Sequence, residues 1–399
     1  MQVKANRQQP KIHTLQIGMG WFGDRAGGLN RYYYDCVNHF PTAEIQFDGL
    51  VAGKKDVESN SQGKVIAFAP SDASLLKRWQ GIRRNFIELT ASQDYDPIVS
   101  HFAFYTFPLL NLLKDRPLVT HFHGPWALES GVEANRSLAV RVKKWLEQKV
   151  YQRSQQFIVL SQTFRDILHQ EYAVPLEQIN VIPGGVDLKH FDIQESKAEA
   201  RQKLGWAKDK TTIFCIRRLA RRMGLENSIA AMSQVCKQYP DTMLYIGGKG
   251  QLKNSLQQQI VELGLEENIK LIGYVADEDL PLCYRAADFS IVPTVALEGF
   301  GLIVIESLAT GTPVLGTPIG GIPEILRPFS TNLVLQSPAV EDLASGIIET
   351  LSGQRQLPDR NACLNYVKTN YTWDIIAPQI KAVYERAINS DRSPKKYHR

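Results

Sequence analysis

Short apolar runs alternate with longer helical patterns along nearly the whole chain, and this alternation restricts the fold more than any other feature. Runs of this kind are typical of βαβ units, in which helices join parallel strands. In the first half we expect strands near residues 13–17, 44–51, 65–68, 97–101, 118–121 and 156–160. In the second half we expect them near residues 212–216, 242–246, 269–272, 289–293 and 313–315. Two doubly wound parallel sheets explain this order better than one.

The length of 399 residues fits two or three domains of ordinary size. We place the main boundary after residue 185, because a short strand near Asn180 runs into Pro183-Gly184-Gly185 and the periodicity resumes only near residue 198. The expected division is residues 1–185, residues 186–372 and a terminal segment, 373–399. Ligands of open parallel sheets bind at the carboxyl ends of the strands, so two facing sheets predict a cleft between the domains.

Composition excludes several classes of protein. The chain is 44% apolar and 22% charged, and no apolar run approaches the ~20 residues of a membrane span. The first ten residues lack the apolar core of a secretory signal, which predicts a cytoplasmic location. The five cysteines are scattered without a CxxC pair, which favours neither disulfides nor structural zinc. A net charge of +5 without an aromatic-studded basic motif predicts no nucleic acid partner.

One basic segment keeps a membrane surface open as a partner. Residues 135–153 place apolar side chains at helical spacing among basic residues that include Arg141, Lys143, Lys144, Lys149 and Arg153. A solvated helix face is the first interpretation of this pattern. Attraction to anionic lipid head groups at the inner face of the membrane is the alternative.

Two glutamates flank a glycine-rich turn in the second half of the chain. Glu298-Gly299-Phe300-Gly301 follows an expected strand and precedes a helical run that begins near Leu302 and contains Glu306. Backbone N–H groups at a helix N-terminus favour an anion, and carboxylates on either side accept hydrogen bonds from hydroxyl groups. The pattern therefore indicates a ligand that combines a sugar, a diphosphate and a ribose.

Residues 294–324 resemble the donor-site signature of retaining, nucleotide-sugar-dependent glycosyltransferases with the GT-B architecture. The likeness is to the large glycosyltransferase family 4-like group that includes sucrose synthases and bacterial mannosyltransferases. The resemblance implies an α/β fold in which two Rossmann-like domains face a cleft, the first on the acceptor side and the second on the donor side. It also implies a C-terminal helix, near residues 373–389, that returns across the cleft to the first domain.

The resemblance also assigns roles to residues. The implied catalytic residues are His123, Glu298 and Arg218, with Glu298 holding the sugar hydroxyls. Glu306 is expected to hold the ribose, and the remaining donor-binding positions lie in turns after expected strands. Together the implied donor-binding residues are Gly27, Gly28, Arg222, Gly248, Tyr274, Val275, Gly299, Phe300, Gly301, Leu302 and Glu306.

A run of four arginines, from Arg217 to Arg222, departs from the family pattern. The pattern is Arg, four residues, Lys, Gly, and Arg218 fits the first position, but Met223 stands where the lysine belongs. Fixed cations here would stabilise the charge of a leaving diphosphate, and guanidinium suits phosphate well. We expect Arg222 to substitute for the missing lysine.

Three histidines lie near the expected strand ends of the first domain. His123-Gly124 resembles the position at which the family contacts the donor sugar, and His101 is the next candidate. We expect His121 to face away from His123. Trp126 is expected either to stack on a sugar ring or to anchor its own loop.

Two acidic pairs, Asp94/Asp96 and Asp277/Asp279, match the Asp-x-Asp pattern by which other glycosyltransferases hold a divalent cation. Asp96 precedes a strand, and Asp277 and Asp279 fit the N-cap and first turn of a helix. We therefore expect no metal and no cofactor.

The expected activity is transfer of a sugar from a nucleoside diphosphate donor, such as a UDP- or GDP-sugar, to a hydroxyl acceptor with retention of configuration, in the synthesis of a glycolipid, polysaccharide or small glycoside. The sequence does not identify the base, sugar, acceptor, linkage or oligomeric state. One alternative is an NAD-dependent oxidoreductase that uses Gly18-x-Gly20-x-x-Gly23, although its loop continues to Gly28 before the helix begins. A non-catalytic nucleotide-sugar binder and a sugar-nucleotide epimerase are further alternatives.

Overall fold

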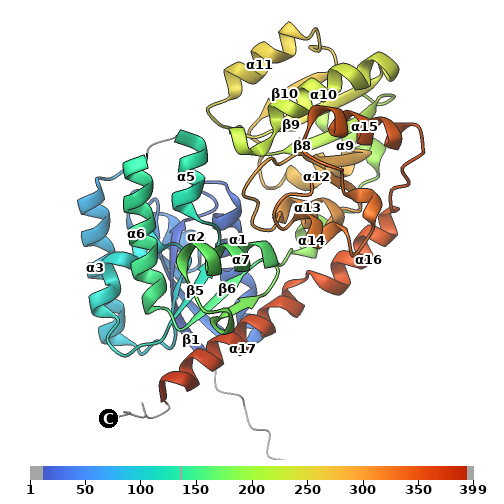
Figure 1. Ribbon diagram of the computed structural model, residues 1–399. Helices are drawn as coiled ribbons and strands as arrows, with labels where there is room; N and C mark the ends of the chain where they lie inside the picture. The colour runs from blue at the N-terminus through green and yellow to red at the C-terminus, as the bar shows by residue number, and fades with distance from the viewer. Residues whose placement is uncertain (1–11, 135–136, 393–399) are drawn as a thin grey trace, which may run out of the picture.

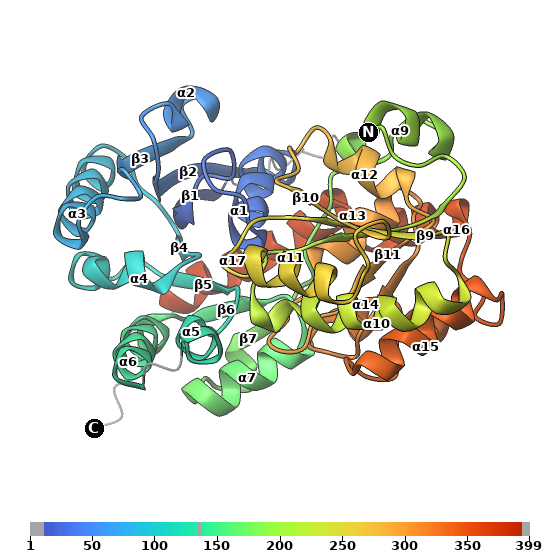
Figure 2. The same ribbon diagram turned by 90° about the horizontal axis from the view of Figure 1, so that it is seen from above.

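The computed structural model describes residues 12–134 and 137–392 and contains two parallel sheets, each surrounded by helices (Figures 1 and 2). The first sheet has seven strands in the order β3-β2-β1-β4-β5-β6-β7. Its strands are β1 (Ile12–Gly20), β2 (Ile45–Ala52), β3 (Val65–Ala69), β4 (Ile98–Ser100), β5 (Leu118–Phe122), β6 (Gln156–Val159) and β7 (Ile179–Val181). Every strand pair in it is parallel.

The second sheet has five parallel strands in the order β10-β9-β8-β11-β12. They are β8 (Thr211–Ile216), β9 (Thr242–Gly247), β10 (Ile269–Gly273), β11 (Phe289–Val292) and β12 (Val314–Gly316). The eleven expected strands are all present, with ends that differ by at most three residues, and β7 is the short strand expected near Asn180. The doubly wound α/β fold class is confirmed.

Helices connect the strands and cover both sheets. Those of the first half are α1 (Gly28–His39), α2 (Val57–Asn60), α3 (Leu75–Ser92), α4 (Ala103–Thr106), α5 (Trp126–Ala134), α6 (Ser137–Arg153) and α7 (Gln162–Tyr172). Those that follow are α8 (Leu188–Phe191), α9 (Lys197–Leu204), α10 (Leu225–Gln238), α11 (Lys253–Glu262), α12 (Leu280–Ala286), α13 (Leu302–Ala309), α14 (Ile322–Leu326), α15 (Val340–Leu351), α16 (Arg360–Asn370) and α17 (Trp373–Arg392). Short 3₁₀ turns are η1 (Phe40–Ala43), η2 (Phe107–Leu112), η3 (Leu176–Gln178), η4 (Arg221–Met223) and η5 (Thr331–Leu333).

Local sequence explains where several helices begin and end. Ser196 and Glu199 form a capping box at the start of α9, in which each side chain accepts a backbone N–H of the other residue. The same helix ends at Gly205, whose φ of 66° lies in the left-handed region that a glycine adopts without strain. Ser161 caps α7 by accepting the N–H of Phe164. These caps fix the helices that follow β6 and precede β8.

Helix α17 runs from the second domain along the underside of the first, as Figure 1 shows in red. Its inward side chains belong to the buried core of the first domain: Trp373, Ile376, Ala377, Ile380, Val383, Tyr384 and Ala387. Where α17 begins, the chain crosses between domains beside the earlier crossing, and Val186 pairs with Thr372 in an isolated parallel bridge. The boundaries placed after residues 185 and 372 fit this geometry and stay a prediction.

Among the described residues, no helix has both the length and the apolar character needed to span a bilayer. All five cysteines are free thiols, four of them buried and Cys236 half-buried.

Candidate functional site

Glu298 lies in the loop between β11 and α13, and its carboxylate is held by an arginine of the neighbouring strand end. Arg217 donates to Glu298 Oε2 and also to Thr294 Oγ1, and only 7% of the Arg217 side chain is exposed. Burial alone would raise the pKa of Glu298, but the charge and hydrogen bond of Arg217, with help from Arg222, lower it below its usual value. Glu298 is therefore an ionised carboxylate fixed in position.

Of the arginine run, Arg217 and not Arg218 makes this contact. Arg217 directly follows the last residue of β8, whereas the next residue, Arg218, is exposed. Sequence reasoning passed over Arg217 because the family pattern matched at Arg218. The available signal was its place at a strand end, where a side chain points toward the carboxyl edge of the sheet.

Arg222 joins the two domains. Its guanidinium donates to the carbonyl oxygen of Leu297, the residue before Glu298, and to Glu129 Oε2 on α5 of the first domain at 3.3 Å. Met223, which stands at the family's lysine position, is buried in the core of the second domain. Arg222 thus lies beside the Glu298 loop, as its expected role requires, and its contact with a phosphate stays a prediction.

The glycine-rich turn after Glu298 is closely packed. Gly301 has a φ of 97° and precedes α13, which begins at Leu302. The ring of Phe300 is buried and packs near Tyr371, so only the backbone of this residue is available to a ligand. A Cβ added at Gly299 would lie 2.6 Å from the ring of Phe164, a residue of α7 in the first domain. The turn therefore lies directly at the interface between the domains.

Glu306 lies about one turn into α13 and is buried. Its carboxylate accepts the hydroxyl of Tyr284 at 3.1 Å. Burial raises the pKa of Glu306, and the positive charge of Arg31 on α1 opposes that rise. Arg31 in turn pairs with Asp277 of the second domain and with Asp35. Glu306 therefore faces the same interface between the domains as Glu298, but it lies beside a different set of charged side chains, that of Arg31 and Asp277.

Gly27 and Gly28 form the start of α1. A Cβ added at either residue would meet no atom within 4 Å, so open space adjoins both. The φ of 147° at Gly27 favours a glycine in any surroundings, whereas neither packing nor φ requires one at Gly28. Open space beside backbone N–H groups at a helix N-terminus suits an anionic ligand.

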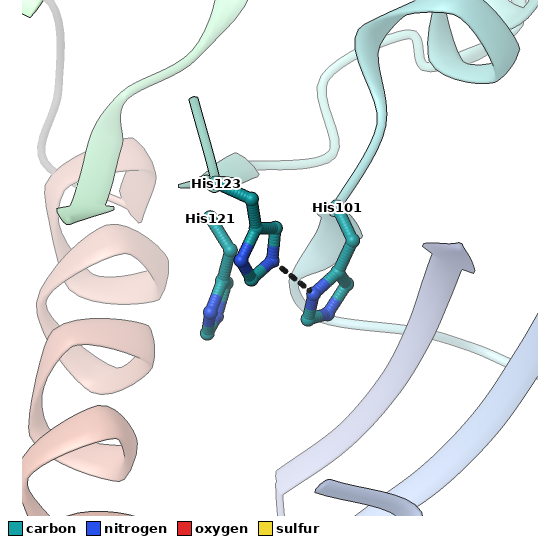
Figure 3. A group of neighbouring side chains, drawn as sticks. All are labelled: His101, His121 and His123. Carbon is teal, nitrogen blue, oxygen red and sulfur yellow. Dashed lines mark hydrogen bonds between the residues drawn. The ribbon is translucent and has the colours of Figure 1, made fainter. Parts of the chain in front are cut away.

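The three histidines lie together at the ends of β4 and β5, as Figure 3 shows. His123 Nε2 lies 3.1 Å from His101 Nδ1, and His101 Nε2 lies 2.7 Å from Gln16 Oε1. The expectation that His121 faces away from His123 is wrong. Residues two apart on a strand share one face, and the rings of His121 and His101 stack with centroids 4.5 Å apart.

The ring nitrogens of His101, His121 and His123 all lie within 4.8 Å of one another, which makes them the one group among the described residues spaced to hold a metal ion. Burial lowers the pKa of His123 to about 3, and burial with the mutual repulsion of the rings lowers the pKa values of the other two. All three are neutral at physiological pH. The expectation that the chain needs no metal stays a prediction.

The two Asp-x-Asp pairs differ in their surroundings. Asp279, expected in the first turn, is the N-cap of α12, and Asp277 precedes the helix, where it pairs with Arg31 and, at 3.4 Å, with His190. The expected positions of both residues are therefore wrong by two residues, because the helix begins only at Leu280. Asp96 precedes Pro97 at the start of β4.

Gly248 follows β9 next to Arg217, and Tyr274 and Val275 follow β10. Gly248 has a φ of 133°, and a Cβ added there would lie 1.9 Å from the carbonyl oxygen of Arg217. Tyr274 is 54% exposed, and Lys249 Nζ lies 4.5 Å from the centre of its ring. Val275 is half-buried beside Gly247. Gly248 thus has a packing role that is independent of any ligand.

The loops that carry His123 and Glu298 face each other across one phenyl ring. A Cβ added at Gly124 would lie 3.3 Å from the ring of Phe164, the same ring that Gly299 contacts. Glu324 of the second domain accepts the N–H groups of Gln162 and Thr163 at the start of α7, at 2.7 and 2.9 Å. The structure therefore brings together the His123 and Glu298 loops, while Arg218 and Tyr274 point to solvent.

The dinucleotide interpretation of Gly18-x-Gly20-x-x-Gly23 has no support in this geometry. Gly20 is the last residue of β1, and α1 begins only at Gly28. A Cβ added at Gly18 would lie 2.7 Å from the ring of Tyr33, so packing explains this glycine.

The two facing sheets and the loops between them define a protein of the GT-B type. The cyanobacterial sucrose-phosphate synthase of Thermosynechococcus elongatus has a similar fold, with a TM-score of 0.80, 21% identity and coverage of 95% of this chain and 100% of that one. Anabaena HepE, solved with UDP and glucose, has a TM-score of 0.75 at 20% identity and covers 94% of this chain and 100% of its own. At these identities the likeness establishes the fold.

Family models establish the family. The model described as "Glycosyl transferases group 1" matches residues 196–370, and the model described as "Glycosyltransferase Family 4" matches residues 26–190. The chain belongs to this family of glycosyltransferases.

Curated relatives include an uncharacterized glycosyltransferase of Methanocaldococcus jannaschii, 28% identical over 65% of this chain and 66% of the relative. A GDP-mannose-dependent monoacylated phosphatidylinositol monomannoside mannosyltransferase of Corynebacterium glutamicum is 30% identical over 51% of this chain and 55% of the relative. The match thus spans between about half and two thirds of the length of these relatives. A D-inositol 3-phosphate glycosyltransferase of Corynebacterium aurimucosum is 24% identical over 95% of each chain.

Proposed function

We propose that the protein transfers a sugar from a nucleoside diphosphate donor to an acceptor hydroxyl and retains the anomeric configuration. The observation that carries this proposal is the half-buried, ionised Glu298, which Arg217 fixes opposite the His123 loop of the other domain. Family membership and neighbours solved with UDP and with UDP-glucose support a nucleotide-sugar donor.

The proposed chemistry uses groups from both domains. Glu298 accepts hydrogen bonds from sugar hydroxyls, and Arg217, Arg222 and the amides at the start of α13 stabilise the diphosphate. The bond between the anomeric carbon and the diphosphate oxygen breaks, and the acceptor oxygen bonds that carbon on the same face. The departing phosphate accepts the acceptor's proton. The fixed cations favour departure because the leaving group gains negative charge in the transition state.

Donor binding is tested with a pair of glycine variants. Wild-type protein should be stabilised by one of a panel of UDP-, GDP- and ADP-sugars, by about 2.7 kcal/mol at a hundred times Kd. Gly28→Ala should keep the unfolding temperature of the free protein, because its Cβ meets open space, yet lose most of the donor-induced shift. The measurement is thermal unfolding with and without each donor.

Gly248→Ala is the matched control for this experiment. Its Cβ collides with the Arg217 backbone, so without any donor it should lower the free energy of unfolding by roughly 3 kcal/mol or more, and with it the unfolding temperature. If the donor raises the unfolding temperature of Gly28→Ala as much as that of the wild type, the diphosphate does not bind at the start of α1. A panel in which only NAD stabilises the protein would favour an oxidoreductase, and products formed without an acceptor would favour an epimerase.

We also propose that helix α6 contacts an anionic membrane surface, since the mannosyltransferase relative is named for a phosphatidylinositol acceptor. Within the described part, 137–153, Leu138, Val142 and Trp145 are 73%, 53% and 50% exposed, beside the exposed cations Arg141 and Lys149. Residues 135 and 136 of the expected segment lie outside the described ranges. Exposed apolar side chains flanked by cations suit an interfacial helix.

Vesicle flotation tests this proposal. The protein should float with phosphatidylglycerol-containing vesicles and not with pure phosphatidylcholine, and Val142→Glu should abolish flotation. Val261→Glu is the matched control, because Val261 is equally exposed, at 53%, on α11 of the second domain. If both variants float equally well, α6 does not contact the membrane.

A further inference from the structure

A chain of hydrogen bonds runs from the interior of the first sheet to His123. The chemistry of each group determines which partner donates and which accepts at every step. The chain of bonds begins on β1, where Thr14 Oγ1 donates to the carbonyl oxygen of Gln46 at 3.0 Å. A hydroxyl has one proton, and a carbonyl oxygen only accepts. Toward its other neighbour, Gln16, Thr14 must therefore accept.

This requirement orients the Gln16 amide. Its Nε2 donates to Thr14 Oγ1 at 3.0 Å, so its Oε1 points the other way, toward His101 Nε2 at 2.7 Å. An amide oxygen cannot donate, and so His101 must carry a proton on Nε2. Thr14 and Gln16 are fully buried, so bulk solvent does not reach these groups.

The proton on His101 also determines which ring donates in the hydrogen bond between His101 and His123. Burial keeps His101 neutral by lowering its pKa, so a ring with a proton on Nε2 has a bare Nδ1. That nitrogen lies 3.1 Å from His123 Nε2, as the dashed line in Figure 3 shows, and a bare nitrogen only accepts. His123 must then carry its single proton on Nε2.

We infer that Gln16 and His101 are positioning residues that fix His123 as its Nε2–H tautomer and leave His123 Nδ1 as a bare acceptor. His123 is half-buried, and its Nδ1 has no hydrogen-bond partner among the described residues. This inference rests on the proposed function, in which His123 contacts the donor sugar. The group that meets His123 must then be a hydrogen-bond donor, such as a sugar hydroxyl.

His121 offers a matched comparison inside the same cluster. Its two ring nitrogens meet the hydroxyls of Tyr32 and Tyr384, at 3.2 and 2.8 Å, so it is equally buried but outside the chain of bonds. A hydroxyl both donates and accepts, and these partners do not fix its tautomer. Replacement of His121 should leave the proton of His123 where it is.

The test is two-bond ¹H–¹⁵N correlation NMR of the imidazoles in the full-length, ligand-free protein near pH 7, with and without EDTA. The wild type should show His123 neutral, with Nε2 protonated and Nδ1 bare, and His121→Gln should preserve that pattern. His101→Leu and Gln16→Leu should produce mixed tautomers of His123. His101→Asn should restore the fixed form, because its Oδ1 can replace the accepting nitrogen.

Kinetics provide the second readout. His101→Leu should lower kcat/KM by about 10–100-fold, as loss of an orienting partner does at other sites, and His101→Asn should recover most of it. The inference is overturned if wild-type His123 is protonated on Nδ1, or if EDTA changes the three histidine signals, which would indicate a bound metal. The tautomer is measured without substrate, so a correct tautomer in a protein that transfers no sugar would defeat the proposed function alone.

Discussion

Glu298→Gln should lower kcat/KM by roughly 10²–10³-fold, equal to about 2.7–4 kcal/mol of transition-state stabilisation. The replacement keeps the size of the side chain and one accepting oxygen but removes the charge that Arg217 holds in place. Hydrogen bonds from sugar hydroxyls to a carboxylate are about twice as strong as those to a neutral amide oxygen. The measurement is steady-state transfer with the donor that thermal unfolding identifies.

Glu349→Gln is the control for charge loss in the same domain. Glu349 pairs with Arg355 at 2.8 Å at the end of α15 and has no contact with the Glu298 loop. It should keep wild-type kcat/KM. If Glu298→Gln binds the donor and retains more than about half of the wild-type kcat/KM, Glu298 has no part in the transition state.

Ending the chain after Thr372 should prevent the first domain from folding, although the second sheet would be complete. Helix α17 supplies five large buried side chains to the core of the first domain, from Trp373 to Tyr384. At about 1.5–3 kcal/mol for each large apolar side chain, their loss exceeds the lower part of the 5–15 kcal/mol by which domains are stable. Far-UV circular dichroism and amide exchange would show which half remains folded.

Two neighbouring isoleucines of α17 allow the effect of burial on stability to be distinguished from the effect of helix propensity. Ile376 is 0% exposed and Ile375 is 36% exposed, so the same replacement by alanine has different costs. Ile376→Ala should lower the free energy of unfolding by about 2–5 kcal/mol, and Ile375→Ala by less than about 1 kcal/mol. Equal losses in urea denaturation would show that α17 does not stabilise the first domain through its buried face.

Strand positions and fold class were predictable because parallel strands buried on both faces leave continuous apolar runs in the sequence. The Glu298 and Glu306 loop was recognisable because its glycines and carboxylates lie close together in the chain. Arg217 was missed because its partner is 81 residues away, and only the folded sheet shows which of two adjacent arginines turns inward.

His121 was misplaced through a wrong use of strand periodicity, since alternate residues share a face. The contact of Asp277 with Arg31 could not be predicted, because it joins the two domains, and the contact with His190 joins residues of the second domain that lie far apart in the sequence. Gly248 and Gly28 look alike in the sequence, and only the space around each shows that one is required by packing and the other is not.

The paired crossing points between the domains determine how the molecule can open. The chain passes from one domain to the other twice, and the two passages are joined by the Val186–Thr372 bridge and by the Val186 N–H bond to Tyr371 O at 2.8 Å. Because these two passages are hydrogen-bonded side by side, they form a single hinge between the domains. A rotation of the second domain about these adjacent passages would separate the His123 and Glu298 loops while α17 stays packed on the first domain.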